Sequence, residues 1–396
     1  MTTVVGGVYA ERCIEPFWDD VYGSGGRAAA AICGELPDVK LVTYRARALG
    51  DGIENLKAAY GLAISGPEAD ADISFEYVHS LADPRITPRP DAIPRLPELE
   101  VDDDTVLRFG MMEGGARVRA RRAVYDPQSA FDPRPFAENG SSVEELALIL
   151  NRLEARRLTG ADEPAVMLDR LLGERVADVV VLKMGAKGLL VGDREERGTA
   201  SAYKSDIVWK IGSGDVFSAA FTLFWAIEGR PPSEAADLSS RATSFYCGTR
   251  SLPFPAAHDL RREIAEPVAA GEGRIYLAAP FFNLAERWLV DEIRAQLLLM
   301  GVEVFSPLHD VGPGPADFVA PRDLEGLDRC QSVLAVLNGG DAGTIFEVGY
   351  AVARGIPVVV LAQNVRSEDL KMPVGSGCRI VEDMVSAIYH AVWSLG

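Results

Sequence analysis

Apolar positions follow two different periods along this chain. Runs rich in β-branched residues, typical of strands, are separated by segments whose apolar residues recur at helical spacing. In the first part of the chain we expect strands at Thr3–Tyr9, Lys40–Tyr44, Ile73–Val78, Thr105–Phe109, Ala123–Tyr125 and Val179–Leu182, and helices at Gly26–Cys33, Val143–Arg157, Asp215–Ile227 and Ser233–Cys247. The proline- and acid-rich stretch Thr87–Asp104 indicates a surface connection, with Asp102–Asp104 as a solvated turn rather than a metal site. The alternation predicts an α/β fold.

The pattern breaks over Ser251–Gly273, where prolines, a short polar segment and glycines interrupt it. A second series of elements follows, with strands expected at 275–279, 302–306, 332–337 and 356–361, and helices at 284–300, 344–354 and 381–394. We therefore predict one domain over residues 1–255, a linker over 256–272, and a second domain over 273–396 built on a small doubly wound parallel sheet.

Charge and composition narrow the classes of partner. The 396 residues carry a formal net charge of −18, a field that repels phosphate backbones and anionic lipid surfaces, so we expect neither a nucleic-acid polymer nor a membrane as a partner. No apolar run approaches the ~20 residues needed to cross a bilayer, and the first residues do not form a secretory signal. The five scattered cysteines include no C-x-x-C pair, which fits reduced thiols in a cytoplasmic protein.

The second domain gathers carboxylates beyond its strands, where ligands bind in an open parallel sheet. Asp310, Asp341 and Glu347 follow strands, together with the aromatic segment Ala279–Asn283. Carboxylates beside aromatic surface suit chemistry at an anomeric carbon. Structural alternatives remain open at this point, because Thr344 and Glu347 have the spacing of a helix-capping box and Asp341 has the place of a turn residue.

Three segments in order, Tyr276–Phe282, Phe305–Pro307 and Asp341–Ala351, resemble the nucleoside 2-deoxyribosyltransferase family. The resemblance covers about 120 residues and implies a flavodoxin- or Rossmann-like domain, no cofactor, and a homo-oligomer. It also implies that Glu347 is the nucleophile at C1′, that Asp341 supports the sugar hydroxyls or orients Glu347, and that Asp323 lies at the departing base. The residues that it places around the substrate are Tyr276, Ala279, Pro280, Phe281, Phe282 and Gly343.

This resemblance implies two displacements through a glycosyl ester of Glu347, with net retention at C1′. The sequence departs from the family pattern at Ala279, where glycine is usual, and at Gln331, where aspartate is common. Relatives that hydrolyse nucleoside 5′-monophosphates typically have small serine- and glycine-containing loops in place of Pro280–Phe282. The aromatic segment of this chain therefore favours an unphosphorylated nucleoside.

In the first domain, Gly212-Ser-Gly-Asp215 precedes an apolar helical face. Glycines at a helix N-terminus let backbone amides surround an anion, and an aspartate there can deprotonate a hydroxyl that attacks a phosphate. The alternative is a glycine turn followed by an acidic residue in the first helical turn.

Several further segments, taken with this one, resemble the PfkB (ribokinase-like) family of sugar and nucleoside kinases over about residues 2–250. They are Val4–Gly7, Gly23–Ala30, Asp126–Gln128, Asn151–Glu154 and Leu182–Gly188. The resemblance implies a three-layer α/β/α domain that uses ATP and Mg²⁺. It implies a catalytic base at Asp215, an anion hole at Gly212, Ser213 and Gly214, indirect magnesium binding through Asn151 and Glu154, ATP contacts at Gly185 and Gly188, and an acceptor site at Gly25, Gly26 and Arg27.

Departures from this family lie on the acceptor side. Glu11 replaces the usual aspartate, Arg27 often has asparagine in its place, and Lys210-Ile211 replaces threonines. Arg27 favours an acceptor with a carboxylate or phosphate, unless it is a surface ion-pair partner. Without the family, Asn151 and Glu154 are equally well explained as an exposed helical pair.

Three interpretations follow. The first is a bifunctional enzyme whose C-terminal domain cleaves or exchanges an N-glycosidic bond and whose N-terminal domain phosphorylates a nucleoside or sugar with MgATP. In the second, the kinase-like domain is a catalytically silent ligand sensor that gates an N-glycosidase. In the third, both domains are non-catalytic assembly modules.

Overall fold

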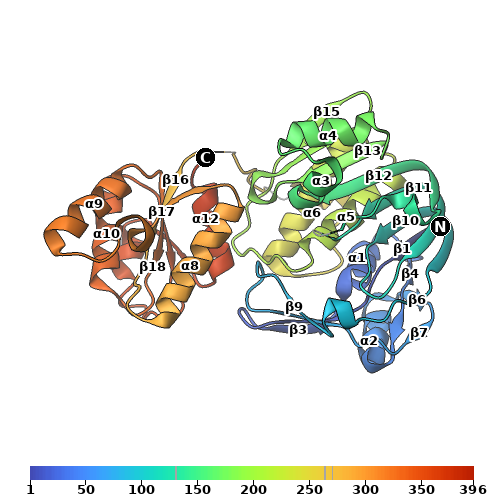
Figure 1. The fold of residues 1–396 in the computed structure, drawn as a ribbon, viewed down its shortest axis with the longest axis horizontal. Coiled ribbons are helices and arrows are strands. Elements are labelled where there is room, and N and C mark those ends of the chain that lie inside the picture. Colours follow the sequence, from blue (N-terminus) through green and yellow to red (C-terminus); the bar gives the residue numbers. More distant parts are fainter. Residues whose placement is uncertain (130–131, 263–264, 270) are drawn as a thin grey trace. The chain divides into compact units, whose positions relative to one another are not determined.

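The computed structural model describes residues 1–129, 132–262, 265–269 and 271–396. The chain forms two units, Met1–Pro267 (the N-terminal unit) and Val268–Gly396 (the C-terminal unit). Figure 1 shows both, each with its own sheet. Within the described ranges, no helix combines the length and apolar character needed to cross a bilayer.

A nine-stranded sheet forms the centre of the N-terminal unit. Its strands lie in the order β15 (Arg197–Ala200), β14 (Leu189–Gly192), β13 (Val179–Lys183), β12 (Ser142–Asn151), β11 (Ala116–Asp126), β10 (Leu99–Phe109), β1 (Thr2–Val5), β4 (Lys40–Val42) and β6 (Ala63–Ser65). All neighbours are parallel except the β13–β14–β15 meander. The parallel strands bring their carboxyl ends to one edge.

Two buried cores cover the two faces of this sheet. One contains apolar residues of α1 (Gly23–Ile32), α5 (Ser213–Phe221), η5 (Thr222–Ile227) and α6 (Pro232–Thr249), and the other those of α4 (Pro164–Gly173) together with Ala155 of α3 (Arg152–Thr159). A smaller sheet joins β3 (Trp18–Val21), β2 (Ala10–Cys13), β8 (Ser74–Tyr77) and β9 (Arg85–Thr87). The remaining α-helices are α2 (Gly50–Tyr60) and α7 (Ala257–Arg262), and the remaining strand pair is β5 (Arg45–Ala46) with β7 (Glu68–Ala69). The three-layer α/β/α arrangement expected from the sequence is present.

Two local predictions in this unit are wrong. Asp102–Asp104 is not a turn but lies inside β10, where Asp102 pairs with Arg119 and Asp104 forms an ion pair with Arg121 at 2.9 Å. The alternating charges of the two strands stabilise this pairing. The expected helix Val143–Arg157 is mostly strand β12, because its Leu/Ala/Glu composition favours a helix while burial between two strands overrides that propensity.

The C-terminal unit is a five-stranded, fully parallel sheet in the order β17 (Glu303–Phe305), β16 (Arg274–Ala278), β18 (Ser332–Val336), β19 (Val358–Leu361) and β20 (Arg379–Val381). Its helices are α8 (Leu284–Leu299), α9 (Ala316–Asp328), α10 (Ala342–Ala353), α11 (Lys371–Gly375) and α12 (Met384–Trp393). The predicted doubly wound sheet is present. The sequence pattern missed α9, whose apolar stripe is short and is interrupted by Pro321.

Candidate functional site

In the C-terminal unit a tyrosine and a carboxylate meet where the strand order reverses. Strand β16 comes first in this unit, and the next two strands along the chain, β17 and β18, lie on opposite sides of it. Ligands bind at such a switch point in open parallel sheets. Tyr276 of β16 is fully buried, and its hydroxyl donates a hydrogen bond to Oε1 of Glu347 in α10, with an O–O distance of 2.5 Å. The site therefore joins the first strand to the helix that follows β18.

The start of α10 leaves the Glu347 carboxylate free for this contact. Gly339 and Gly340 have φ values of +83° and +66°, a left-handed conformation that glycine adopts without strain. Asp341 is the N-cap, and its Oδ2 accepts hydrogen bonds from the amide of Thr344 at 2.7 Å and from its hydroxyl at 2.9 Å. The alternative in which Thr344 and Glu347 form a capping box is wrong, because the helix begins three residues earlier and Asp341 supplies the cap.

Two carboxyl groups in this unit have raised pKa values. Burial raises the pKa of Glu347 to about 7; the Tyr276 hydrogen bond acts against this rise, and the charges of Asp323 and Asp341 add to it. Burial also raises the pKa of Asp323, on α9, to about 6. Oδ1 of Asp323 is buried and has no hydrogen-bond partner among the described residues. A half-buried carboxyl with one buried, unsatisfied oxygen is suited to holding or delivering a proton.

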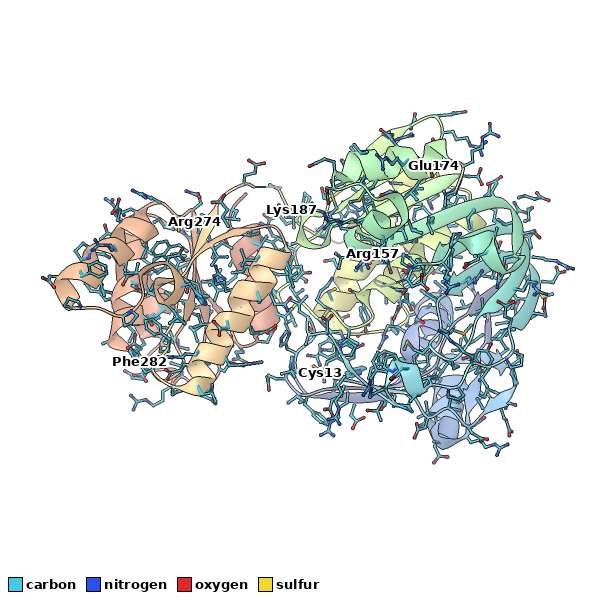
Figure 2. All side chains as sticks on the ribbon, viewed as in Figure 1. Cys13, Arg157, Glu174, Lys187, Arg274 and Phe282 are labelled. Carbon is cyan, nitrogen blue, oxygen red and sulfur yellow. The ribbon has the colours of Figure 1, made fainter. Side chains whose placement is uncertain are left out.

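The loop after β16 carries two phenylalanines. Phe281 and Phe282 stack with their ring centroids 5.5 Å apart, and Phe282 is 73% exposed. Phe282 is labelled in Figure 2. The buried Ala279 and Pro280 connect these rings to the strand. Gly343 lies in the first turn of α10, where an added Cβ would come within 3.1 Å of Asp341 Oδ2 and crowd the cap. Exposed aromatic rings offer a surface on which a nucleobase can stack.

Asp310, the third carboxylate expected at this crevice, makes its polar contacts with the turn after β17 and with Arg274. Its Oδ2 accepts a hydrogen bond from the Ser306 amide at 2.8 Å, and Arg274 Nη2 lies 3.6 Å from its Oδ1. Its contacts therefore hold the turn after β17.

In the N-terminal unit, helix α5 begins after a turn in which the Ser213 amide donates to the Lys210 carbonyl at 3.1 Å. Gly212 is its N-cap, with a left-handed φ of +76°, and no side chain caps the amides of the first turn. An added Cβ on Gly214 would lie 3.5 Å from Nζ of Lys183. An ammonium group therefore lies beside a helix N-terminus, and the two together attract an anion.

The carboxyl ends of three neighbouring strands supply polar groups next to this turn. Asp126 ends β11, Asn151 ends β12 and Lys183 ends β13. Asp126 Oδ2 accepts hydrogen bonds from Lys183 Nζ at 2.9 Å and from the Ser218 hydroxyl at 2.8 Å. Burial alone would lower the pKa of Lys183, but the nearby carboxylates outweigh it and raise this pKa. Sequence reasoning missed Asp126 and Lys183 as site residues, although each is the polar last residue of an apolar strand.

Asn151 and Glu154 form a reciprocal capping box at the start of α3. The Glu154 amide donates to Asn151 Oδ1 at 2.9 Å, and the Asn151 amide donates to Glu154 Oε2 at 2.8 Å. Glu154 also accepts from the Ser129 amide at 2.9 Å and is only 1% exposed. The alternative of an exposed helical pair is therefore wrong. Burial, then the charge of Asp126, raise the pKa of Glu154 to about 7.

These groups fit a magnesium ion that is held indirectly. Across the described part of the chain, no three His, Cys, Asp or Glu side chains are grouped closely enough to hold a metal directly. Mg²⁺ commonly keeps several waters and takes its other ligands from phosphate oxygens. Asp126 and Glu154 would then orient the metal-bound waters while the nucleotide supplies the direct ligands.

Asp215 lies in the first turn of α5, with both carboxylate oxygens in contact with other side chains. Its Oδ2 accepts from Arg27 Nη1 at 3.0 Å and its Oδ1 from Gln128 Nε2 at 2.6 Å. Arg27 also forms a two-point ion pair with Glu11 and is only 1% exposed. The expectation that Arg27 is a surface ion-pair partner is wrong. Burial, opposed by Arg27, raises the pKa of Asp215 to about 6.

Four glycines predicted near ligands occupy left-handed or closely packed backbone positions. Gly185 and Gly188 have φ values of +60° and +84°, and a Cβ on Gly188 would overlap the Ala200 carbonyl. An added Cβ on Gly25 would lie 2.6 Å from the Gly6 carbonyl oxygen, and one on Gly26 would lie 3.2 Å from the side chain of Leu56. Gly25 and Gly26 thus let helix α1 approach its neighbours closely.

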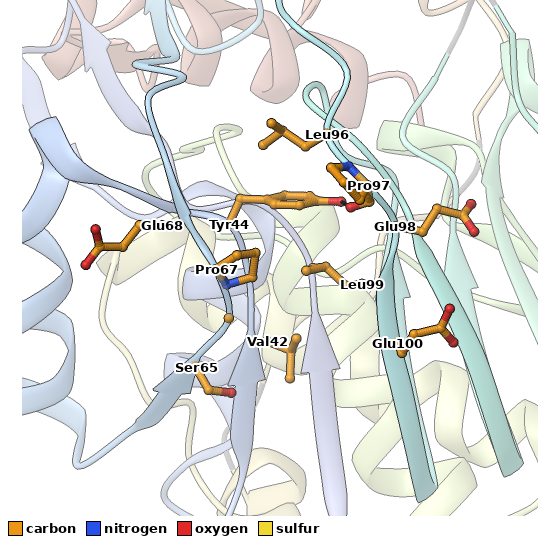
Figure 3. Close-up of a pocket in the computed structure, with 11 residues that line it drawn as sticks. Val42, Tyr44, Ser65, Pro67, Glu68, Leu96, Pro97, Glu98, Leu99 and Glu100 are labelled. Carbon is orange, nitrogen blue, oxygen red and sulfur yellow. Dashed lines mark hydrogen bonds between the residues drawn. The ribbon is translucent and has the colours of Figure 1, made fainter.

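A separate cavity lies near the ends of β4, β6 and β10 (Figure 3). None of the residues that we predicted to act in catalysis or binding lines it. Its lining residues are Val42, Tyr44, Ser65, Gly66, Pro67, Glu68, Leu96, Pro97, Glu98, Leu99 and Glu100.

Comparison with known proteins finds two family models on this chain. The pfkB family of carbohydrate kinases matches residues 132–257, and the nucleoside 2-deoxyribosyltransferase family matches residues 275–380. No curated protein matches.

Similar solved structures each cover 66% of this chain. They include a ribokinase from Thermotoga maritima (17% identity, 98% of that chain, TM-score 0.48). A pyrophosphate-dependent kinase of the ribokinase family, complexed with a pyrophosphate analog and myo-inositol, is 18% identical over its whole length (100%), with a TM-score of 0.45. Phosphofructokinase-2 from Escherichia coli is 14% identical over 97% of its length, with a TM-score of 0.49.

Proposed function

We propose, on the premise that this chain joins a pfkB-family segment to a nucleoside 2-deoxyribosyltransferase-family segment, that the C-terminal unit cleaves or exchanges the N-glycosidic bond of a nucleoside. The observation that carries this proposal is the hydrogen bond between the buried Tyr276 and the half-buried Glu347 at the switch point of a parallel sheet. Oε1 of Glu347 accepts from Tyr276, and among the described residues its Oε2 has no hydrogen-bond partner. That oxygen is available to attack a carbon.

The reaction we propose has two balanced steps. In the first, a Glu347 oxygen forms a bond to C1′ while the bond from C1′ to the base nitrogen breaks, and Asp323 donates its proton to the departing base. In the second, a new base or water attacks C1′, the ester bond to Glu347 breaks, and the proton of the attacking group returns to Asp323. Asp341 orients the start of α10, and with it Glu347. Two displacements retain the configuration at C1′.

The aromatic loop supports an unphosphorylated substrate. Phe281 and Phe282 offer apolar ring faces for the base or sugar, and Phe282 is open to solvent. Phe346, on α10 beside Glu347 in sequence, is also 61% exposed. We propose that a neighbouring copy of the chain covers these rings in a homo-oligomer, because a monomer would leave them in contact with water.

For the N-terminal unit the first candidate is phosphorylation of a nucleoside or sugar with MgATP. The amides of Gly212–Asp215 and the Lys183 ammonium would hold the transferred phosphate, with Asp126 and Glu154 orienting the waters of Mg²⁺. Asp215 would then accept the proton of the acceptor hydroxyl as that oxygen attacks phosphorus.

One observation favours a second candidate for this unit, a nucleotide sensor that does not transfer phosphate. Both carboxylate oxygens of Asp215 are engaged by other side chains, one of them by the buried guanidinium of Arg27. A sensor of this kind would bind its ligand without turnover and would gate the glycosyl chemistry of the C-terminal unit.

The test of the glycosyl reaction uses the full chain, a panel of ribo- and deoxyribonucleosides, and an added free base. Chromatography should show base exchange or release, and Glu347→Ala should abolish it. Leu284→Ala, at a position that is 85% exposed at the start of α8, is the control and should retain activity. If the wild type and Glu347→Ala behave alike on every nucleoside that reacts, the proposal is wrong.

A further inference from the structure

The acceptor side of the N-terminal unit is filled by side chains of the unit itself. A catalytic base must come within about 2.6–3.2 Å of the proton it removes. At Asp215 that position is held by Arg27, whose Nη1 lies 3.0 Å from Oδ2, while Gln128 Nε2 lies 2.6 Å from Oδ1. Asp215 is 7% exposed and Arg27 is 1% exposed. Each oxygen of Asp215 accepts one hydrogen bond in this arrangement, and a hydroxyl from outside would have to reach the carboxylate past the guanidinium.

Arg27 is held in place from several directions. Its two terminal nitrogens pair with the two oxygens of Glu11. Its guanidinium carbon lies 5.0 Å from the centre of the Tyr22 ring. A Cβ added to Gly212 would overlap the Arg27 side chain, so the guanidinium packs directly on the glycine that starts α5. Nε of Arg27 is buried without a hydrogen-bond partner in the described structure.

Aromatic residues close the space around this ion-paired cluster. Trp209 and Tyr246 are each 1% exposed. Trp18 of the small sheet packs on Trp209 with ring centroids 5.6 Å apart and on Tyr22 at 6.2 Å. Trp209 lies three residues before Gly212, so the segment leading into the α5 turn is connected through Trp18 to Tyr22, the ring beside Arg27.

The charges also argue against an acceptor that simply docks on Arg27. One guanidinium faces two carboxylates, those of Glu11 and Asp215, so this cluster has no surplus positive charge for a carboxylate or phosphate. Lys183 lies beside the α5 turn, where its Nζ would be 3.5 Å from a Cβ on Gly214, and it is itself paired with Asp126 at 2.9 Å. An anion bound at this turn would therefore depend on the backbone amides and the helix N-terminus as well as on Lys183.

We infer that Arg27 is an intramolecular occupant of the acceptor position. The N-terminal unit accordingly binds the phosphates of a nucleoside di- or triphosphate with Mg²⁺ but does not pass a phosphoryl group to a sugar or nucleoside hydroxyl. This inference rests on the proposal that the N-terminal unit is a nucleotide sensor. It adds the class of ligand that the sensor binds and the residue, Arg27, that blocks phosphoryl transfer.

The first experiment measures binding and turnover of MgATP by the full chain, with ribose, deoxyribose and a panel of nucleosides as acceptors. Wild type should bind MgATP in calorimetry, and Lys183→Ala should weaken binding about tenfold or more through loss of a charge-assisted contact to phosphate. ADP release should stay at the level of the Asp215→Asn variant with every acceptor. ADP release that depends on Asp215 would overturn the inference about Arg27. Failure to bind MgATP at all would instead overturn the sensor proposal itself.

The second experiment asks whether the guanidinium position can be refilled. In Arg27→Ala, millimolar methylguanidinium should raise the thermal unfolding temperature, because the ion re-pairs Glu11 and Asp215, whereas wild type should show no rise. Equal responses of the two proteins would contradict the inference. If Arg27→Ala does not fold, the ADP measurement on the wild type decides the matter alone.

Discussion

Glu347 and Asp323 are two carboxyl groups whose protonation is controlled by burial. The pKa of Glu347 is raised to about 7 and that of Asp323 to about 6, in both cases chiefly by burial. The proposed reaction needs an ionised carboxylate to attack C1′ and a protonated one to assist the departing base. Two carboxyls with different surroundings can divide these tasks.

The pH dependence of glycosyl exchange should therefore be bell-shaped. The ionised fraction of Glu347 grows as pH rises, and the protonated fraction of Asp323 falls. With pKa values of about 7 and about 6, the active combination is most populated between these two values. A kcat/KM profile measured from pH 4.5 to 9 checks this.

Asp323→Asn should lose about 10²–10⁴-fold in rate, the usual contribution of a general acid. Its profile should also lose the fall at high pH and reach a plateau, because only Glu347 then titrates. A bell that persists unchanged in this variant would contradict the role given to Asp323.

Tyr276→Phe tests the hydrogen bond to the nucleophile. The Tyr276 hydroxyl lowers the pKa of Glu347, so its removal should raise that pKa, move the rate maximum to higher pH and reduce its height. Tyr350→Phe is a matched control on the same helix as Glu347, because the Tyr350 hydroxyl contacts the exposed Asp328. The control should keep the wild-type profile, and a Tyr276→Phe profile that also does not move would count against the pair.

At the scale of the element, the start of helix α10 decides where Glu347 points. The carboxylate of Asp341 satisfies an amide of the first turn and the Thr344 hydroxyl, so the helix begins directly after the Gly339-Gly340 turn. From the sequence, Thr344 had the place of the cap and Asp341 that of a turn residue. The structure begins the helix at Ala342, which makes Asp341 the cap.

Asp341→Ala should destabilise the C-terminal unit by about 1 kcal/mol, the usual value of an N-cap, and should also lower kcat because α10 loses its fixed start. Asp383→Ala removes a similar cap, on the Ser386 amide of α12. Denaturant unfolding and exchange assays on both variants separate the two effects. If Asp341→Ala and Asp383→Ala lose the same stability and also the same activity, Asp341 affects the reaction only through stability.

At the scale of the whole molecule, the sequence predicted the two-family order, both α/β sheets and the positions of ten of the twenty strands among the described residues. The strands of the C-terminal unit could be predicted from continuous apolar runs, because helices cover both faces of that sheet. The helix predicted over Val143–Arg157 was wrong because pairing of this segment with β11 and β13 overrides its local helix propensity. Arg27 and Asp215 lie 188 residues apart in the chain, and their contact is set by tertiary packing. The sequence signalled it only in that Glu11 and Arg27 depart from the family pattern.

The most direct test of the central claim is to trap the ester at Glu347. The full chain is mixed with nucleosides that react, quenched in acid and digested, and the peptide containing Glu347 is examined by mass spectrometry. The account predicts a mass increase equal to the bound sugar on Glu347, absent from Glu347→Gln. Base exchange that continues in Glu347→Gln, or a sugar found on another side chain, would contradict it.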